Sequence, residues 1–280
     1  MINNDLNQFI ENAIREDIGD GDHSSLSCIP AGATGKAQLI VKEEGIIAGI
    51  EIARHIFSHL DKSITFNQLI ADGAKVRLGD IAFTVEGKTQ TLLLAERLVL
   101  NIMQRMSGIA TKTNEYVRQL EGLNTKVLDT RKTTPGLRVL EKMAVKMGGG
   151  ENHRMGLYDM IMLKDNHVDF AGGIKQAITA AQNYLKQNGK DLKIEIEVRN
   201  LDELQQVLEI GGVHRIMLDN FDTVTTKKAV AMIDGRFETE SSGGITMETL
   251  RSYAECGVDY ISVGALTHHI KSMDMSLKAC

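Results

Sequence analysis

The sequence has 280 residues, of which 42% are hydrophobic and 25% charged, a composition typical of a protein with a packed core rather than a disordered chain. The formal net charge of −5 argues against a general nucleic-acid binder. No apolar run approaches the roughly 18 residues of a membrane helix, and the N-terminal segment lacks the pattern of a signal peptide. We therefore expect a cytoplasmic protein without nucleic-acid or membrane partners.

The N-terminal part combines helical and strand-like patterns. Residues 5–18 carry apolar side chains near helical spacing and predict an amphipathic helix. From about 34 to 87, short apolar segments alternate with glycines, which predicts a small β-rich sandwich with a helix at about 51–60. Residues 91–120 are apolar with a helical period, and Gly108 predicts a break in this long helix.

Short apolar runs that end in charged or small polar residues follow, with helical patterns between them. The runs are KVLDTRK, DMIMLKDNH, KIEIEVRN, HRIMLDNF, GRFETESSGG and DYISVGA. Glu197, Asp219, Ser241 and Val263 recur every 22 residues, about the length of a strand, a helix and two loops. This pattern predicts a βα-barrel. An open Rossmann-type sheet is the alternative, but no G-x-G-x-x-G follows a strand.

A barrel places active-site residues at the carboxyl ends of its strands. The predicted strand ends carry Arg131, Lys132, Lys164, Glu197, Asp219, Ser242 and Gly264. Seven basic and three acidic residues lie between positions 131 and 164, a charge of +4 within a chain of −5. Such a cationic region indicates a site for a small, highly charged anion, whereas a solvated helix face is the alternative.

Glycines mark a candidate phosphate site. Ser242, Gly243 and Gly244 lie between a predicted strand and a helix, where backbone N–H groups and the helix dipole attract phosphate. Gly264 lies in the next loop and could complete this cup, because barrel enzymes often bind phosphate in their last two loops. A plain turn is the alternative.

Two carboxylates and a basic group stand beside this loop. Glu197 and Asp219 could hold Mg²⁺ through waters or bind ribose hydroxyls, and a structural salt bridge to Lys164 or Arg131 is the alternative. The basic group suits carboxylate recognition, because arginine binds carboxylates in a bidentate manner and lysine provides a point charge. Its members are Arg131, Lys132, His153, Arg154 and Lys164.

Residues 130–167 carry the most specific motif. The segment TRKTTPGLRVLEKMAVKMGGGENHRMGLYDMIMLKDNH resembles the signature of the quinolinate phosphoribosyltransferase family. REDIGDGDHSS, DGAKVRLGD, LLLAERLVLNIMQRMSGIAT, IEIEVRN, IMLDNF, SSGGI and ISVGALT occur in the order expected for this family. The resemblance covers nearly the whole chain.

The resemblance implies an α/β fold with two domains. Residues 1–109 would form an N-terminal α/β sandwich, and residues 110–266 an incomplete βα-barrel of the type II phosphoribosyltransferase kind. Residues 267–280 would pack back on the N-terminal domain. The family forms homodimers, or dimers assembled into hexamers, in which the N-terminal domain of one subunit covers the barrel mouth of the other. Arg97 would cross over in this way.

The implied activity is transfer of phosphoribose from phosphoribosyl pyrophosphate to quinolinate with loss of CO2, a step of NAD biosynthesis that uses Mg²⁺. The substrate-binding residues implied are Arg97, Thr130, Arg131, Lys132, Arg138, His153, Arg154, Lys164, Glu197, Asp219, Ser242, Gly243, Gly244 and Gly264. The catalytic candidates are Lys132, His153, Lys164, Glu197 and Asp219, with Glu197 and Asp219 as magnesium ligands. Lys132 and His153 are alternative proton donors. One extra residue between Glu197 and Asp219 leaves Glu195 as an alternative to Glu197.

Three other functions fit parts of the sequence. A related pyrophosphorylase associated with molybdenum transport would keep the phosphoribosyl half of the site and change the acceptor half. A Schiff-base aldolase barrel would use Lys164 at a strand end. A carrier or interaction module would use only the β-rich segment, although no exposed lysine stands in the tight turn that a carrier needs. The intact basic motifs and the paired glycine loops favour the transferase.

Overall fold

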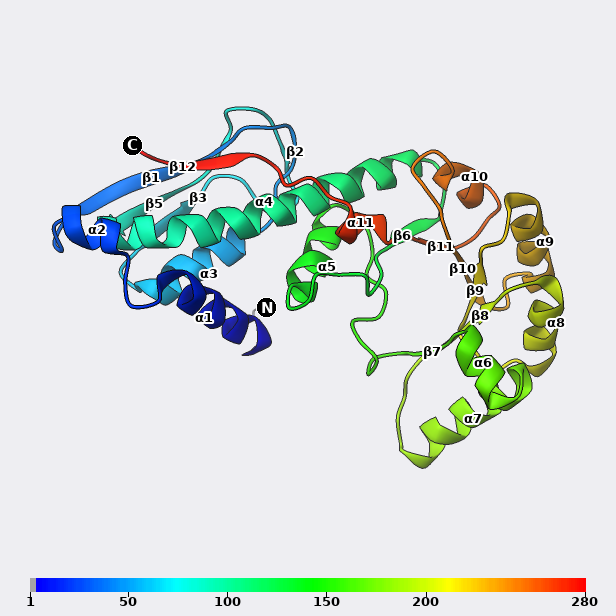
Figure 1. The fold of residues 1–280 in the computed structure, drawn as a ribbon. Helices are drawn as coiled ribbons and strands as arrows, with labels where there is room; N and C mark the ends of the chain where they lie inside the picture. The colour runs from blue at the N-terminus through cyan, green and yellow to red at the C-terminus, as the bar shows by residue number, and fades with distance from the viewer. Residues whose placement is uncertain (1–3) are drawn as a thin grey trace. The chain divides into compact units, whose positions relative to one another are not determined.

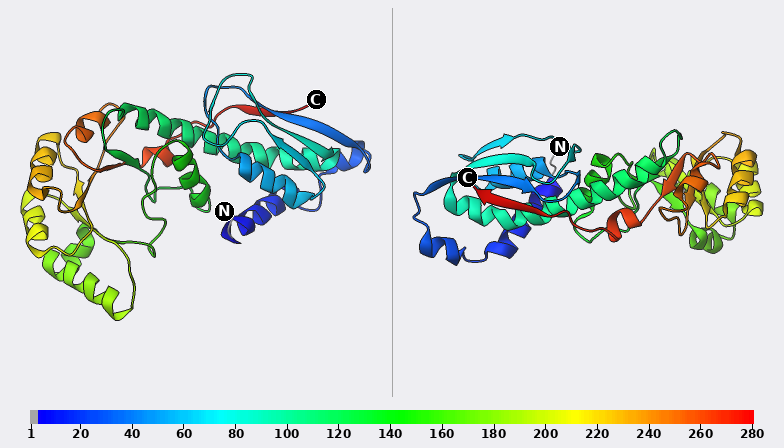
Figure 2. Two further views of the ribbon diagram at one scale, coloured as in Figure 1. Left: turned by 180° about the vertical axis from the view of Figure 1, so that it is seen from behind. Right: turned by 90° about the horizontal axis from the view of Figure 1, so that it is seen from above.

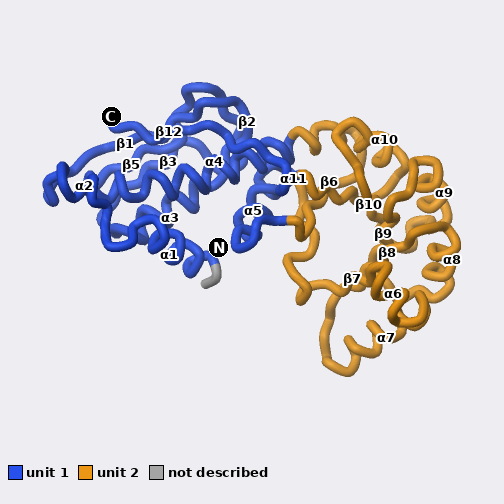
Figure 3. The backbone as a smooth tube through the Cα atoms, in the orientation of Figure 1, with its two compact units in different colours: residues 1–114, 133–149, 266–280 blue, residues 115–132, 150–265 orange. Residues whose placement is uncertain are grey.

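The computed structural model describes residues 4–280, which form two compact units (Figure 3). Unit 1 contains residues up to 114, residues 133–149 and residues 266–280, and unit 2 contains residues 115–132 and 150–265. Residues 1–3 of the predicted N-terminal domain lie outside the described part. Residues 133–149 had been expected in the barrel domain, but they belong to unit 1.

An ion pair and a backbone contact attach this segment to unit 1. The guanidinium of Arg105 donates to the buried carboxylate of Glu141 at 2.9 and 2.6 Å. The amide of Asn114 donates to the carbonyl oxygen of Gly148 at 3.3 Å. Since Arg105 and Asn114 lie on the long helix of unit 1, residues 133–149 pack with that helix rather than with the barrel strands.

Unit 1 consists of an antiparallel sheet with helices (Figure 1). Its strands are β1 (Thr34–Val41), β2 (Gly45–Ile46), β3 (Thr65–Gln68), β4 (Lys75–Val76), β5 (Ile81–Lys88) and β12 (Met275–Ala279). Its helices are α1 (Asn4–Ile18), α2 (His23–Cys28), α3 (Ile50–Leu60), α4 (Thr89–Gln119), α5 (Arg138–Met147) and α11 (Ala265–His268), although α4 continues to its end in unit 2 and α11 begins there. The main sheet has the order β12-β1-β5-β3, and β2 pairs with β4.

The core of unit 1 follows from period-two alternation along its strands. Every second residue of β1 from Ala37 to Val41 is buried, so one face of the sheet is apolar. Phe57 of α3 packs on this sheet, with its ring centroid 6.3 Å from that of Phe83 in β5. Both rings are fully buried, and each contributes about 1.5–3 kcal/mol through removal from water. The C-terminal strand β12 pairs with β1, with Met275 opposite Val41.

The long helix α4 continues through Gly108, so the predicted break is wrong. Glycine serves a different purpose here, because an ideal Cβ on Gly108 would lie 2.2 Å from the carbonyl oxygen of Lys271. The chain after α11 passes close to the helix at this point, and the N–H of Met273 donates to the carbonyl oxygen of Gln104 at 3.0 Å. Gly108 therefore permits a close approach of two backbones.

Unit 2 is built on one sheet of parallel strands. The strands are β6 (Lys126–Leu128), β7 (Ile161–Leu163), β8 (Ile194–Val198), β9 (Arg215–Asp219), β10 (Glu238–Ser242) and β11 (Tyr260–Ser262), in the order β6-β11-β10-β9-β8-β7. Every predicted strand run contains one of them. The helices are α6 (Asp165–Ala171), α7 (Ile174–Gln187), α8 (Leu201–Ile210), α9 (Thr223–Ile233) and α10 (Leu250–Ala254). Helices α7, α8 and α9 cover the outer face of the sheet (Figures 1 and 2), which forms the expected incomplete barrel.

Local signals set the starts of two of these helices. The side chains of Asn200 and Asp222 accept hydrogen bonds from the N–H groups of Glu203 and Thr225 and so cap α8 and α9. At the β6 edge, Glu151 forms a parallel bridge with Leu128. This bridge brings the following residues, 152–154, beside the barrel strands. Within residues 4–280, no helix has the combined length and apolarity needed to cross a membrane.

We expect Gly108→Ala to lower the free energy of unfolding by about 1–3 kcal/mol, measured by urea denaturation and circular dichroism. The added methyl group would displace the backbone of Lys271, although alanine itself favours helix. Asn101→Ala, at an exposed position of the same helix, is the control and should not destabilise the protein. Stability of Gly108→Ala equal to the wild type would contradict the close approach.

Candidate active site

The strands of unit 2 end at one edge of the sheet, because all of them are parallel. This edge brings together residues that the sequence placed at strand ends. Thr130, Arg131 and Lys132 follow β6, Lys164 follows β7, Glu197 lies in β8, Asp219 and Ser242 end β9 and β10, and Gly264 follows β11. Arg97 and Arg138 belong to unit 1. Arg97 is exposed on α4, and the Nε of Arg138, at the start of α5, donates to Thr133 Oγ1 at 3.0 Å.

Glu197 and Asp219 form an acidic pair at this edge. Burial and the charge of Asp219 raise the pKa of Glu197, although Lys164 opposes the shift from 3.8 Å. Burial also raises the pKa of Asp219, although the amide of Asn220 donates to Asp219 Oδ2 at 2.7 Å. Two carboxylates that repel each other favour a bound cation. The pair therefore fits Mg²⁺, whose usual ligands are carboxylate oxygens and substrate phosphates.

The basic side chains of the site include two neighbouring guanidinium groups. Burial and the nearby charge of Arg131 lower the pKa of Arg154. Arg154 is held in this place by its Nη1, which donates to the carbonyl oxygen of Met160 at 3.3 Å. Close like charges favour a bound anion, and two arginines suit a dicarboxylate. Nearby, the N–H of Lys132 donates to Thr130 Oγ1 at 3.0 Å.

The loop after β10 has the backbone that a phosphate cup requires. Gly243 and Gly244 have φ values of 100° and 60°, which favour glycine. An ideal Cβ on Gly243 would lie 2.2 Å from the side-chain oxygen of Asn220. Asn220 itself has a φ of 56°, and its N–H donates to the carbonyl oxygen of Ser242 at 2.9 Å. Asn220, which the sequence analysis missed, thus contacts both Asp219 and the glycine loop.

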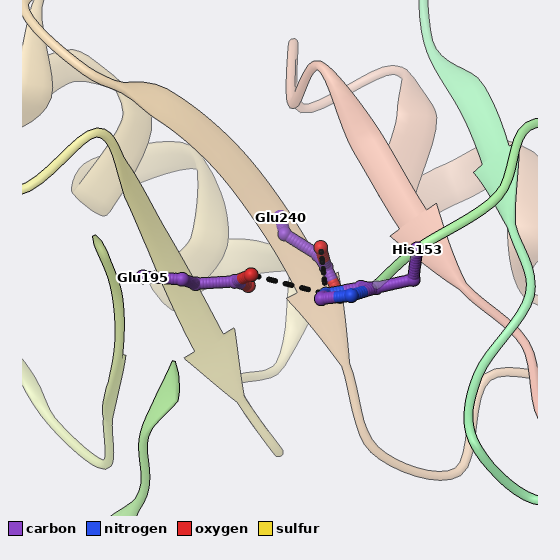
Figure 4. Close-up of side chains that lie close together, drawn as sticks. All are labelled: His153, Glu195 and Glu240. Carbon is purple, nitrogen blue, oxygen red and sulfur yellow. Dashed lines mark ion pairs between the residues drawn. The ribbon is translucent and has the colours of Figure 1, made fainter. Parts of the chain in front are cut away.

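His153 lies inside the barrel between two carboxylates, as Figure 4 shows. Its Nε2 lies 3.0 Å from Glu195 Oε2 and 3.4 Å from Glu240 Oε2. Burial alone would lower the pKa of His153, but hydrogen bonds and charges from Glu195 and Glu240 outweigh burial and raise it to about 9. The N–H of Arg154 approaches Nδ1 at 2.7 Å, a contact that needs an unprotonated Nδ1. This hydrogen bond requires the neutral ring, with its hydrogen on Nε2, and so opposes the rise in pKa. Nε2 lies against Glu195 Oε2 without a hydrogen bond of regular geometry.

The carboxylates around His153 depend on Arg215. Its Nη1 donates to Glu240 Oε2 at 3.0 Å, and its guanidinium lies 4.1 Å from the ring centroid of Tyr260. Burial and the charge of Glu240 raise the pKa of Glu195 to about 7, whereas His153 and Arg215 outweigh burial and lower the pKa of Glu240. Glu240 and Arg215 were not among the residues predicted from the sequence. Their signal was a charged residue at a central strand position where apolar residues usually stand.

Glu195 and Glu197 therefore occupy different surroundings. Glu195 contacts His153 inside the barrel, whereas Glu197 faces Lys164 and Asp219 at the strand ends. The sequence left Glu195 and Glu197 as alternatives for one functional carboxylate, but the structure places the two side chains in separate environments. Asp129, also missed, is fully buried and accepts the N–H of His153 at 2.9 Å, which anchors the turn that carries the histidine.

Comparison with known proteins agrees with this geometry. Residues 22–107 match the family model described as quinolinate phosphoribosyl transferase, N-terminal domain, and residues 109–278 match that of the C-terminal domain. The chain therefore belongs to the quinolinate phosphoribosyltransferase family, with both of its domains.

Similar proteins come from plants and bacteria. A quinolinate phosphoribosyltransferase [decarboxylating] of Nicotiana tabacum is 44% identical over 98% of this chain and 82% of its own length. A probable nicotinate-nucleotide pyrophosphorylase [carboxylating] of Bacillus subtilis is 42% identical over 97% of this chain and 92% of its own. The crystal structure of NadC from Streptococcus pyogenes has a TM-score of 0.92 at 38% identity and covers 98% of this chain and 97% of its own.

We expect Asp219→Asn to stabilise the protein while it abolishes catalysis. A raised carboxyl pKa means that the folded state binds protons more tightly than the unfolded state, so ionisation of the acidic pair destabilises the fold as pH rises. Removal of one charge should raise the free energy of unfolding by about 0.5–2 kcal/mol at neutral pH, and the gain should vanish below the pKa values of both carboxyls. Thermal denaturation at several pH values measures this, with the exposed Asp191→Asn as control. A loss of stability at neutral pH would contradict the repulsion.

Proposed function

We propose that this protein joins quinolinate to phosphoribosyl pyrophosphate and releases pyrophosphate and CO2, giving nicotinate mononucleotide for NAD biosynthesis. The observation that carries this proposal is the meeting of a guanidinium pair, Arg131 and Arg154, with an acidic pair, Glu197 and Asp219, at one edge of a parallel sheet. One pair suits a dicarboxylate acceptor and the other suits a magnesium-bound pyrophosphate donor. The names of the plant and bacterial relatives support the same reaction.

The basic residues would bind the acceptor. Quinolinate is a dianion, and binding it relieves the repulsion between Arg131 and Arg154. Lys164 and Lys132 would neutralise the charge of the pyrophosphate, whose departure leaves positive character on the ribose. Thr130 positions the backbone of Lys132. The pyridine nitrogen then attacks the ribose carbon from a fixed position, which removes much of the entropic barrier.

The acidic residues would bind the donor. Glu197 and Asp219 would hold Mg²⁺ and the ribose hydroxyls, and their negative charge favours the cationic sugar in the transition state. Mg²⁺ supplies further positive charge to the leaving pyrophosphate. Ser242, Gly243, Gly244 and Gly264 would hold the 5′-phosphate through backbone N–H groups. Arg138 provides a further basic position in unit 1.

Decarboxylation follows from the quaternised pyridine nitrogen, which stabilises the carbanion left when the neighbouring carboxylate departs as CO2. A proton must then reach the ring carbon. Of the two candidate donors, Lys132 is exposed, whereas His153 is 7% exposed and directs Nε2 toward Glu195. These surroundings support Lys132 as the donor and a positioning role for His153.

We further propose a homodimer, or dimers assembled into a hexamer, in which Arg97 of one subunit completes the site of another. The support for this arrangement is the family pattern and the exposure of Arg97 on α4. We also propose a cytoplasmic location for this protein, whereas some plant relatives are named as mitochondrial or chloroplastic.

Arg131→Ala should lower kcat/KM for quinolinate by roughly 10²–10³, the usual effect of losing one donor to a developing charge. The assay mixes protein, phosphoribosyl pyrophosphate, Mg²⁺ and quinolinate and follows nicotinate mononucleotide by mass spectrometry, with nicotinate as parallel acceptor. Arg236→Ala, near the amino end of β10, is the matched control and should be unaffected. Wild-type kinetics in Arg131→Ala would remove this arginine from the site. No product from quinolinate with the wild type would overturn the reaction.

A mixture of two inactive variants tests the shared site. Arg97→Ala and Lys164→Ala should each be inactive as homodimers, but dimers containing one subunit of each should recover activity, because one of their two sites keeps both residues. Differently tagged subunits allow such dimers to be isolated by two affinity steps after refolding or coexpression. Isolated mixed dimers that remain inactive would rule out a site shared in this manner.

A further inference from the structure

A buried ionic network lies below the strand ends of unit 2. His153, Glu195, Glu240 and Arg215 come from one turn and three different strands, and each is at most 9% exposed. The two carboxylates and the imidazole point toward one another across the barrel interior (Figure 4). Ionised groups in the interior lose their hydration, so such a network destabilises the fold unless its members satisfy one another. A network of this kind needs a reason beyond stability.

The network holds one side chain in a defined orientation. Two strands, β8 and β10, provide the carboxylates, so the imidazole is fixed from two directions. Arg215 pairs with Glu240 and stacks on Tyr260, which keeps the second carboxylate in place. On the backbone side, Asp129 accepts the N–H of His153. Rotation of the imidazole would therefore break the contacts of Nε2 with both carboxylates.

His153 in turn positions Arg154, one of the two arginines proposed to bind the acceptor. Its Nδ1 accepts the N–H of Arg154, the arginine paired with Arg131. The charge of Glu195 also favours the Arg154 guanidinium, which burial and Arg131 disfavour. The network thus supports the pair of Arg131 and Arg154 in two ways. His153 accepts the N–H of Arg154, and the carboxylate of Glu195 provides a counter-charge.

We propose that Glu195 and Glu240 are positioning residues for the acceptor half of the site, where they hold His153 and Arg154 in the geometry that receives the dicarboxylate. Glu197, two residues along the same strand, serves the donor half instead. This inference rests on the proposed function, because it assigns to quinolinate the pocket that Arg131 and Arg154 form. Neither carboxylate touches substrate, and each acts through the histidine and the arginine.

A divalent metal is the other occupant that such residues could take, since their ligand atoms lie within 4.8 Å of one another. Arg215 argues against it, because its guanidinium already supplies Glu240 with a cation at 3.0 Å. His153 Nε2 lies 3.0 Å from Glu195 Oε2, a distance of direct contact that leaves no room for an ion between these two atoms. We therefore assign the cluster to positioning and treat metal as an outcome of the test.

Steady-state kinetics of Glu195→Gln and Glu195→Ala test the assignment, with each substrate varied in turn. We expect KM for quinolinate to rise on the order of 10–100-fold in Glu195→Ala, with KM for phosphoribosyl pyrophosphate little changed. Glu195→Gln should recover part of this loss, because its amide oxygen can occupy the place of Glu195 Oε2 beside Nε2. Glu197→Gln should show the reverse pattern, with the defect in phosphoribosyl pyrophosphate.

Glu238→Gln is the matched control. Glu238 lies on the same strand as Glu240 and binds Arg215 at 3.0 Å, while His153 pairs with Glu195 and Glu240. Glu238→Gln should leave the KM values for quinolinate and phosphoribosyl pyrophosphate near those of the wild type. Equal rises in both KM values in Glu195→Ala, or unchanged values, would overturn the positioning assignment. A wild type inactive with quinolinate would instead refute the proposed function, so the two failures are distinguishable.

Nuclear magnetic resonance on the wild type tests the protonation of His153 directly, without a kinetic measurement on a variant. With ¹⁵N-labelled histidine, the signals of His153, identified by their loss in His153→Gln, should show a hydrogen on Nε2. A ring with unprotonated Nε2 would overturn the proposal, as would elemental analysis that finds one bound divalent metal per chain, lost in Glu195→Gln.

Discussion

The site depends on the repulsion between like charges that a rigid parallel sheet holds together. Arg131 and Arg154 repel each other, and so do Glu197 and Asp219. In a flexible chain these groups would move apart, but here they stand on strand ends or turns fixed by backbone hydrogen bonds of the same sheet. Lys164 offsets part of the repulsion between the carboxylates, and Glu195 offsets part of that between the guanidinium groups. The arrangement destabilises the protein alone and favours the bound state, which is the usual balance at an active site.

The strands of unit 2 could be predicted because they are short, apolar and bounded by polar residues. The regular spacing of 22 residues was a weaker guide than it looked. The residues paired in register with Glu197 across the sheet are Met217, Glu240 and Tyr260. The successive spacings in the sequence are therefore 20, 23 and 20 residues. Loop lengths vary from one unit to the next, and a constant period in the sequence does not maintain a constant register. The period therefore indicated repeated βα units, but only the register of the sheet shows that Met217, and not Asp219, lies opposite Glu197.

Other features could not be found in the sequence, because they depend on contacts between distant segments. Gly108 was interpreted as a helix breaker, but the residue that requires glycine there is Lys271, at the other end of the chain. Glu240 and Arg215 stand in runs that predict strands, and a sequence pattern does not show which charged residues meet inside a barrel. The motif around His153 was correctly judged specific. Its resemblance to a substrate-binding motif did not indicate that the ring itself would face inward, toward Glu195.

Depth along one strand explains why two neighbouring glutamates differ. Glu195 and Glu197 point to the same side, about 7 Å apart along β8. The deeper carboxylate is fully buried, and the charged groups beside it, His153 and Arg215, come from the protein itself. The outer carboxylate is close enough to the strand end for Lys164 and a bound ion to share it. Residues two apart on one strand thus take part in two different sets of contacts. Glu195 belongs to a network formed by protein side chains alone, and Glu197 stands where a ligand could bind. The first set can therefore orient the arginines proposed to bind the acceptor, beside the second.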